Sequence, residues 1–334
     1  MVNKMKFLLC GIGSIGQRHF RNLNGLGQEI ALLRSRKNTT PFIEKFFEEQ
    51  KKNGLLIPIF YDLESALASF QPNAVVVANP NSLHMPIALA GARAGCHLFI
   101  EKPVSHTMAQ MSELTELIRK NNLTAMIGYN LRFHPLLQLM KKMYEAGDIG
   151  HAVSVHVEVG ENIEDWHPWE DYRDAYACYK SGGGGVTLCF SHDIDYLYWF
   201  FGMPLKIFAL GGKKTLLGGD AEDTVKALLE FNGGLVASLH MDYWQKPGKR
   251  TFEIIGTLGK LIWDCRMGTL IFEKRDSSKQ VFHTPQNFDR NDMFINEMKE
   301  FLWSLQEKRE AFIPLREGID VLRIVLDIKN KIGI

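Results

Sequence analysis

The sequence predicts an α/β protein with two domains, and three features of its 334 residues lead to this prediction. A short apolar run, Lys6–Cys10, leads into a glycine-rich turn and then into a segment with helical periodicity. A second run, Ala74–Val77, is apolar on both faces, as a central strand of a parallel sheet must be. From Ala152 onward, apolar and polar residues alternate, which is typical of an antiparallel sheet with one covered face.

Length and composition narrow the classes of partner. A chain of this length suits two domains, each with its own core. Its 39 lysines and arginines nearly balance its 38 aspartates and glutamates, so no net field attracts nucleic acid or an anionic membrane. The five cysteines lack C-x-x-C spacing, and no apolar stretch approaches the roughly 20 residues that span a bilayer. We therefore expect a cytoplasmic protein with a small-molecule substrate, no metal, no nucleic acid and no membrane contact.

A glycine-rich turn follows the first expected strand and predicts a dinucleotide-binding site. The first glycine permits a tight turn, the second leaves no side chain between backbone and ligand, and the third lets the next helix lie close to the strand. Free backbone N–H groups at the start of that helix then face a diphosphate. The residues of this site are Gly11, Gly13, Ser14, Ile15 and Gly16. The alternative is a turn with only a structural role.

The residues after the second expected strand, Glu29–Leu33, bear on the choice of cofactor. Dinucleotide-binding units that prefer NAD usually carry an acidic residue there, whereas an arginine accommodates the 2′-phosphate of NADP. This chain has Arg34, Ser35 and Arg36 and no carboxylate. We therefore expect NADP or NAD as the cofactor, with NADP favoured. In the alternative, these residues form a solvated basic loop in which Arg34 only stacks on adenine.

Polar side chains stand where two central strands end. Asn79 and Pro80 close one strand, and Glu101 and Lys102 close the next. Open parallel sheets bind ligands at this carboxyl edge, so all four residues are candidates to contact a ligand there. A lysine held there can orient a substrate hydroxyl and stabilise an alkoxide; the alternative is a surface salt bridge with Glu101. His84, in the first turn of the next helix, is a candidate cofactor residue or else a cap or packing residue.

The remaining elements follow from periodicity and turn residues. In the first half we expect helices over 41–52, 63–70, 83–94 and 108–121, and strands over 57–61, 97–100 and 124–127. In the second half we expect strands over 206–210, 225–231, 235–243, 251–255, 260–264 and 269–273, and helices over 196–201, 292–306 and 317–331. The domains are expected to be 1–129 for the cofactor and 130–334 for substrate binding and oligomerisation. The last two helices are expected to return and brace them.

The segment 165–173 is too aromatic for an idle loop and too charged for a core. Flat rings beside polar groups, as at Trp166 and Tyr172, suit a sugar, which has apolar C–H faces and a belt of hydroxyls. Arg173 can grip a carboxylate or phosphate through two hydrogen bonds. The alternative is a contact between domains or subunits.

A histidine at the start of an apolar helix is the second candidate for chemistry. His192 follows a run of four glycines and lies among Ser191, Asp193 and Asp195. Because histidine titrates near neutrality, it can take a hydroxyl proton as hydride leaves the same carbon. The structural alternative is helix capping by Ser191 or Asp193.

Four motifs, in this order and spacing, resemble the glucose-fructose oxidoreductase / inositol dehydrogenase / MocA family over essentially the whole chain. They are the glycine turn, the segment 79–84, Glu101-Lys102-Pro103 and the segment 128–135. The resemblance implies an N-terminal Rossmann domain with a doubly wound parallel sheet. It also implies a C-terminal α/β domain whose open, mainly antiparallel sheet supports homodimers or homotetramers. By the same resemblance, Lys102 is catalytic, and Asn79 and Glu101 lie along the cofactor. The other expected cofactor residues in these motifs are Pro80, Lys102 and Asn130.

The resemblance further implies an NAD(P)-dependent oxidoreductase that acts on a secondary hydroxyl or ketone of a sugar. His192 is the expected base, although the aspartate that the family carries four residues earlier is Leu188 here. What orients His192 is therefore open, with Asp193 and Asp195 as the nearby carboxylates. The segments 165–173 and 183–195 most resemble members from surface-polysaccharide and nonulosonic-acid gene clusters, which points to a nucleotide-linked or acidic sugar. The expected substrate residues are Arg132, Trp166, Tyr172, Arg173 and Asp195.

Two other functional classes remain open. The family includes enzymes that use NAD transiently to break glycosidic bonds, with no net redox change. It also includes regulators that sense cofactor and sugar without catalysis. The presence of both Lys102 and His192 argues against a regulator, since a sensor needs neither.

Overall fold

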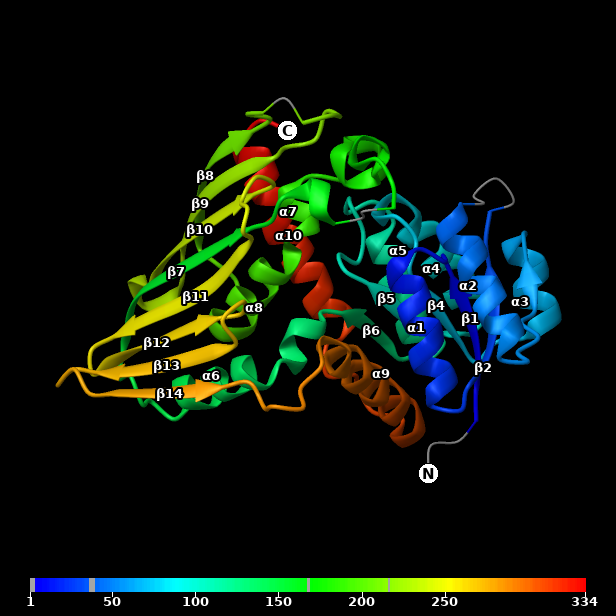
Figure 1. The fold of residues 1–334 in the computed structure, drawn as a ribbon, viewed down its shortest axis with the longest axis horizontal. Coiled ribbons are helices and arrows are strands. Elements are labelled where there is room, and N and C mark those ends of the chain that lie inside the picture. The colour runs from blue at the N-terminus through cyan, green and yellow to red at the C-terminus, as the bar shows by residue number, and fades with distance from the viewer. Residues whose placement is uncertain (1–3, 36–39, 167–168, 216) are drawn as a thin grey trace. The chain divides into compact units, whose positions relative to one another are not determined.

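The computed structural model describes residues 4–35, 40–166, 169–215 and 217–334, and the chain forms two compact units (Figure 1). The first unit contains the chain up to Tyr129 together with Phe294–Ile319. The second contains Asn130–Met293 and Asp320–Ile334. Residues 294–319, which the sequence places in the second domain, thus lie in the first unit.

The first unit is built on a six-stranded parallel sheet with the order β3-β2-β1-β4-β5-β6. Its strands are β1 (Lys6–Cys10), β2 (Glu29–Leu33), β3 (Ile59–Phe60), β4 (Ala74–Val77), β5 (His97–Glu101) and β6 (Ala125–Gly128). Its helices include α1 (Ser14–Gly25), α2 (Pro41–Lys52), α3 (Leu63–Phe70), α4 (His84–Arg93) and α5 (Met111–Lys120). The strand order reverses direction between β1 and β4, which confirms the doubly wound fold.

Local signals explain most boundaries in this unit. Gly27, just beyond α1, has φ +75°, as a residue that follows a helix end often does. The carboxylate of Asp62 caps α3 by accepting the Ser65 N–H at 2.8 Å. The strand β3 is shorter than expected, because Pro58 has no N–H to donate to a neighbouring strand.

The returning segment completes the first unit. It comes from α9 (Arg290–Glu307) and α10 (Leu315–Lys331), which each cross the division between the units. The fully buried Phe301 ring lies edge-on to Phe7 and Phe99 of the sheet, with centroids 6.5 and 5.6 Å away. The N–H of Ile127 donates to the carbonyl of Ile313 at 3.0 Å. Residues 294–319 therefore cover the sheet and its β6 edge.

The second unit contains an eight-stranded sheet with the order β14-β13-β12-β11-β7-β10-β9-β8. The strands are β7 (Ala152–Gly160), β8 (Lys206–Gly212), β9 (Thr224–Glu230), β10 (Val236–Asp242), β11 (Lys249–Gly256), β12 (Gly259–Asp264), β13 (Thr269–Lys274) and β14 (Lys279–His283). Only β7 and β10 pair in parallel, so the mainly antiparallel sheet is confirmed. The mostly exposed strand β14 has no regular apolar pattern and was not expected.

Helices cover one face of this sheet (Figure 1). They are α6 (Pro135–Glu145), α7 (Val186–Cys189) and α8 (Ser191–Phe201). Tyr196 of α8 stacks on Phe252 of β11 with centroids 4.8 Å apart. Short 3-10 turns complete both units: η1 (Asn81–Leu83), η2 (Asn130–Phe133), η3 (Ile163–Asp165), η4 (Tyr172–Asp174), η5 (Tyr176–Cys178), η6 (Lys180–Gly182) and η7 (Asn232–Gly234).

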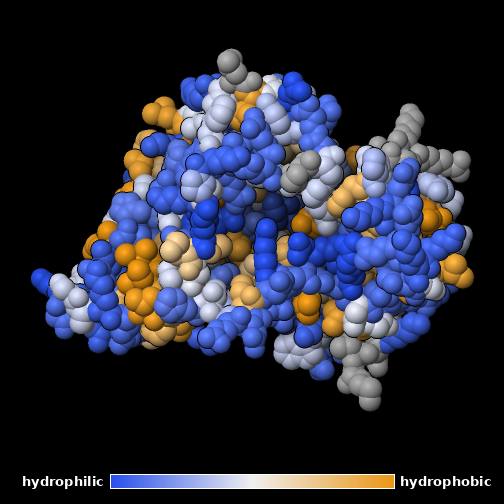
Figure 2. Space-filling view, viewed as in Figure 1, coloured by the Kyte–Doolittle hydropathy of each residue, from blue (hydrophilic) through white to orange (hydrophobic). Residues whose placement is uncertain are grey.

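Hydrophilic residues predominate on the face of the molecule shown in Figure 2, and apolar side chains occur there in small groups. Within the described ranges, no helix is long and apolar enough to cross a membrane.

His134 caps α6 from a buried position. Its Nδ1 accepts the Leu136 N–H at 3.3 Å, and its ring lies edge-on to Trp263 and Phe288, each 5.2 Å away between centroids. Burial lowers the pKa of His134 to about 4. A proton on Nδ1 would remove the cap acceptor, so the folded state requires the neutral ring.

We expect His134 to make the folded state less stable at acidic pH. As pH falls from about 6.5 towards 4, His134 becomes protonated in the unfolded chain but stays neutral in the folded protein. The folded state therefore loses stability across this pH window. At about 1.4 kcal/mol per pKa unit, the free energy of unfolding should fall by about 2 kcal/mol between pH 7 and pH 5. Urea unfolding at both pH values measures this loss. His134→Asn retains a cap acceptor and should lose about 2 kcal/mol less; an equal loss would show that another group is responsible.

Candidate functional site

The glycine turn after β1 has the shape that a diphosphate site needs. Gly11 has φ +101°, and a Cβ there would lie 2.6 Å from the carbonyl oxygen of Ala78. A Cβ on Gly16 would lie 2.2 Å from the carbonyl oxygen of Gly11. Gly13, the N-cap of α1, has no described atom within 4 Å of its Cβ position. Gly11 and Gly16 thus allow close packing, while Gly13 leaves open space before the free N–H groups of Ser14 and Ile15.

The end of β4 offers a second feature that fits a dinucleotide. The Oδ1 atom of Asn79 is buried and has no hydrogen-bond partner among the described residues. A buried carbonyl oxygen without a donor is costly, and the amide and hydroxyl groups of a dinucleotide can supply one. Pro80 beside it is exposed. The open space at Gly13 and the orphaned oxygen of Asn79 are what a bound dinucleotide would use.

The cofactor-selecting residues are described only in part. The guanidinium carbon of Arg34 lies 5.1 Å from the centre of the Phe47 ring of α2, and Ser35 is exposed. Arg36 lies outside the described residues. Arg34 therefore stands at the end of β2, where the sequence places it, with its side chain against an aromatic ring.

The carboxylate of Glu101, at the end of β5, is held by the protein itself. Only 8% of this residue is exposed. One carboxylate oxygen lies 2.6 Å from Nε2 of His19, and the other accepts the backbone N–H of Lys102 at 3.2 Å. A Cβ on Gly128 would lie 3.2 Å from this carboxylate, so the glycine makes room for it. Sequence analysis did not place His19 at this edge, because His19 and Glu101 are 82 positions apart.

His84 does not face an open cleft. Its side chain is fully buried, with Nε2 2.8 Å from the carbonyl oxygen of Asn79 and Nδ1 2.8 Å from that of Pro103. This burial favours the packing role that the sequence left as the alternative, and a contact with the cofactor stays a prediction. The ring is a packing residue that links the loop after β4 to the loop after β5.

Arg132 and Asp195 pair with each other instead of presenting their charges to a ligand. Both side chains are 1% exposed, with Nη2 to Oδ1 at 2.7 Å and Nε to Oδ2 at 3.0 Å. A buried charge needs a partner, and each of these residues supplies one for the other. Their role in substrate binding stays a prediction. Asn130, in the same 3-10 turn as Arg132, is also buried.

The carboxylates beside His192 are bound by side chains of other segments. Asp193 accepts Nε of Arg250 at 3.1 Å and the hydroxyl of Tyr196 at 2.8 Å, while Asp195 is bound to Arg132. Burial raises the pKa of Asp193, and Arg250 opposes this shift. His192 is partly exposed in the first turn of α8. Its helix is thus fixed by the neighbouring aspartates.

An aromatic cluster adjoins the start of α8. The indole of Trp166 lies edge-on to Phe190 and Tyr243, with centroids 5.6 and 5.2 Å away. Its Nε1 is buried and has no hydrogen-bond acceptor in the part of the chain that the structure describes. Phe190 comes two positions before His192, so the structure brings Trp166 to the helix that carries this histidine. Sequence analysis did not identify Phe190 or Tyr243, which are ordinary apolar positions in the sequence.

Arg173 is exposed but already paired. Its guanidinium donates three hydrogen bonds to the carboxylate of Asp171, at 2.5, 2.9 and 3.0 Å, and these hydrogen bonds lower the pKa of Asp171 to about 2. The half-buried Tyr172 accepts the thiol of Cys178 at its backbone carbonyl, 3.2 Å away. An anionic ligand at Arg173 must therefore compete with Asp171.

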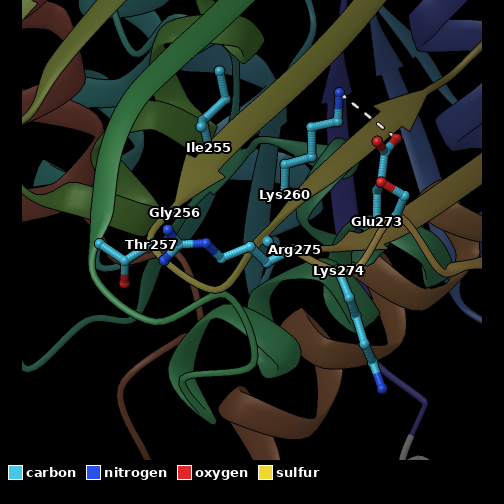
Figure 3. Close-up of a pocket in the computed structure, with 9 residues that line it drawn as sticks. Ile255, Gly256, Thr257, Lys260, Glu273, Lys274 and Arg275 are labelled. Carbon is cyan, nitrogen blue, oxygen red and sulfur yellow. Dashed lines mark ion pairs between the residues drawn. The ribbon is translucent and has the colours of Figure 1, made fainter.

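Two further observations complete the survey of sites. Among the described residues, no group of three or more His, Cys, Asp or Glu side chains could hold a metal ion. A surface pocket at one end of the second unit's sheet contains the ion pair of Lys260 with Glu273, at 3.6 Å (Figure 3). Its lining residues are Ile255, Gly256, Thr257, Gly259, Lys260, Glu273, Lys274, Arg275 and Ser277. None of the residues predicted for the site lines this pocket.

Comparison with known proteins places the two halves of the chain in one group. Residues 5–129 match an oxidoreductase family with an NAD-binding Rossmann fold, and residues 137–262 match the GFO/IDH/MocA C-terminal domain. An uncharacterised oxidoreductase of Synechocystis is 30% identical over 81% of this chain and 80% of its own length. Levoglucosan dehydrogenase of Pseudarthrobacter phenanthrenivorans is 28% identical over 64% of this chain, a match that spans 59% of that relative.

Solved structures share the fold. A levoglucosan dehydrogenase in complex with NADH and levoglucosan superimposes with a TM-score of 0.86 at 20% identity, covering 99% of this chain and 98% of the other. A UDP-N-acetylglucosamine 3-dehydrogenase from Acidithiobacillus ferrooxidans gives 0.80 at 20% identity, with the same coverage. The glycine turn, the NAD-binding sheet and the C-terminal domain together show that this chain belongs to the GFO/IDH/MocA family of oxidoreductases.

Proposed function

We propose that the protein transfers hydride between NAD(P) and a secondary hydroxyl or ketone of a sugar. The observation that carries the proposal is the edge of the first unit's sheet, where Lys102 follows the fixed carboxylate of Glu101 beside the open turn at Gly13. Relatives named levoglucosan dehydrogenase and myo-inositol 2-dehydrogenase support a sugar as the substrate.

Each residue has a defined task in the oxidation. When bound, the nicotinamide supplies the hydride acceptor for the substrate carbon. His192 accepts the hydroxyl proton, and the ammonium group of Lys102 stabilises the negative charge that develops on the same oxygen. The C–H and O–H bonds break as the C=O bond forms, and reduction reverses each transfer.

The aromatic cluster supports the sugar part of the proposal. The Trp166 ring offers an apolar face to sugar C–H groups, and its Nε1 needs the acceptor that a hydroxyl provides. We extend the proposal to a nucleotide-linked or acidic sugar, whose anionic group would take the place of Asp171 at Arg173. A cytoplasmic location belongs to the same proposal and is supported by five cysteines that form no disulfide.

We expect Lys102→Ala and His192→Ala each to lower kcat by at least about 100-fold, with the Kd of NADH or NADPH nearly unchanged. The assay follows nicotinamide absorbance with NAD or NADP and a panel of levoglucosan, myo-inositol, UDP-N-acetylglucosamine and N-acetylneuraminate. Lys120→Ala, at an exposed position of α5, is the matched control and should retain full turnover.

The outcomes separate the candidate functions. Full activity in either variant refutes the role of that residue. Product formed without net reduction of the cofactor would favour the internal-redox glycosidase or lyase. Tight cofactor binding with no product from any compound would favour a regulator.

We also propose a preference for NADP, supported by Arg34, by Ser35 and by the absence of a carboxylate after β2. Arg34→Ala should weaken NADPH binding by about 10- to 100-fold, as loss of one charge-assisted hydrogen bond predicts, and change NADH binding little. Titration of protein fluorescence with each reduced cofactor gives both values of Kd. An equal loss for the two cofactors would show that Arg34 only stacks on adenine.

We further propose that the protein is a homodimer or homotetramer that associates through the second unit's sheet. Helices cover one face of the sheet, and the other face exposes large apolar side chains on β8 and β9. Phe208 and its cross-strand neighbour Leu228 are 64% and 50% exposed, and Leu210 is 82% exposed. Neighbouring exposed apolar residues of this kind are typical of a protein interface.

Phe208→Asp combined with Leu228→Asp should convert the oligomer into a monomer of 38.0 kDa, because paired carboxylates cannot be buried at an apolar interface. Light scattering coupled to size-exclusion chromatography measures the mass. The control is Leu56→Asp, at a leucine that is 96% exposed in the first unit. A wild-type mass of one chain, or an unchanged mass in the double variant, would contradict the interface.

A further inference from the structure

Two buried histidines hold the residues on either side of Lys102. His19 contacts the carboxylate of Glu101, the residue before the lysine, and His84 contacts the carbonyl of Pro103, the residue after it. Both histidine side chains are completely buried. Neither can therefore contact a substrate, and the mechanism above gives neither of them a task.

Aromatic packing on two sides holds the ring of His19. It lies edge-on to Phe99 and Phe294, with centroids 5.1 and 6.1 Å away, and this packing aims Nε2 at Glu101. Its Nδ1 is buried without a partner among the described residues. The carboxylate accepts hydrogen bonds only, so Nε2 carries the hydrogen and donates it.

The N–H group of His19 supports the backbone of Lys102 through the carboxylate of Glu101. The buried carboxylate of Glu101 uses one oxygen for His19 and the other for the Lys102 N–H, at 3.2 Å. If His19 no longer donated, a buried anion would lose half of its hydrogen bonds and would turn towards another donor. That rotation would break its bond to the backbone of the lysine.

His84 contacts the residue that follows Lys102. Its two ring nitrogens lie 2.8 Å from the carbonyl oxygens of Asn79 and Pro103. Both carbonyls accept at once only from the doubly protonated ring. Burial lowers the pKa of His84, and the two carbonyls oppose that shift. The ring lies between the loops that follow β4 and β5, within hydrogen-bond distance of a carbonyl oxygen of each.

The sheet topology explains why the two rings converge on one lysine. The strands β1, β4 and β5 are successive neighbours, so the segments that follow them begin at the same edge. His19 comes from α1, after β1, and His84 comes from the start of α4, after β4. The lysine at the end of β5 is thus tied to both neighbouring crossovers.

We infer that His19 and His84 are positioning residues that fix the backbone of Lys102, an inference that rests on the proposed catalytic role of that lysine. They act through Glu101 and Pro103. A reacting group displaced by about 1 Å loses about 100-fold in rate, so a small rotation of this loop is enough to impair turnover.

The test compares His19→Phe with His19→Gln. Phenylalanine keeps the ring packing and removes the donor, whereas glutamine places an N–H the same number of bonds from Cβ as Nε2. His19→Phe should lower kcat by about 10- to 100-fold on the panel sugar that the wild type converts fastest, with the Kd of NADH within twofold. His19→Gln should recover most of this loss. The control is His97→Gln, at the opposite end of β5, where Nδ1 accepts the Thr124 N–H at 2.9 Å.

Hydrogen exchange gives a readout that does not depend on turnover. In His19→Phe, the amide of Lys102 should exchange faster in a peptide covering 99–106, while His19→Gln and His97→Gln should match the wild type. If His19→Phe does not fold by circular dichroism, His84→Asn, whose side chain is too short to span both carbonyls, is measured in the same two ways.

A double variant separates the two proposals. Once Lys102→Ala has removed the ammonium group, adding His19→Phe should lower the residual turnover no further. A further tenfold loss, a rise in the Kd of NADH that matches the fall in kcat, or wild-type kcat in His19→Phe would overturn the positioning role alone. Full activity in Lys102→Ala would overturn the proposed function, and the exchange measurement would still decide whether His19 anchors the loop.

Discussion

The close approach of α1 to the sheet is the constraint on which the first unit depends. A Cβ on Gly16 would lie 2.2 Å from the carbonyl oxygen of Gly11, and a Cβ on Gly11 would lie 2.6 Å from that of Ala78. Only glycine at both positions lets the helix and the two strands meet backbone to backbone. This contact fixes the axis of α1, so that its first turn opens at the proposed diphosphate site and His19, farther along the helix, reaches Glu101 at 2.6 Å. One packing constraint thereby sets both the cofactor turn and the support of Lys102.

In the second unit, buried ion pairs fix the position of a helix, as close backbone packing does for α1 in the first unit. The first turns of α8 place Asp193 and Asp195 against Arg250 and Arg132, and both carboxylates are buried. Removing one partner of such a pair typically costs about 3–5 kcal/mol, because the other charge remains buried and uncompensated. The two pairs tie the helix to β11 and to the turn η2, and they hold the segment that carries His192.

Sequence was informative where the physical cause is local. The turn at Gly13, the cap at Asp62 and the central strand β4 each depend on a few consecutive residues, and all three appear as expected. The sequence does not predict which residues far apart along the chain form hydrogen bonds or ion pairs with each other. The sequence shows that Arg132 and Asp195 are charged, but not that these residues, 63 positions apart, lie together and buried. The same holds for the buried ring of His84, which pattern alone could not distinguish from a cofactor residue. The edge strand β14 was missed because its side chains are mostly exposed and carry no regular apolar alternation.

The path of the chain has a consequence for how the protein is made. The polypeptide passes from one unit to the other after Tyr129, after Met293 and again after Ile319. A ribosome that has synthesised the first 129 residues has therefore produced six strands whose β6 edge and Phe301-facing surface are still uncovered. The N-terminal sheet therefore stays partly uncovered during translation until the whole C-terminal sheet has been synthesised. Neither unit corresponds to a continuous gene segment, so the two cannot be separated by a single cut or exchanged between relatives as simple modules.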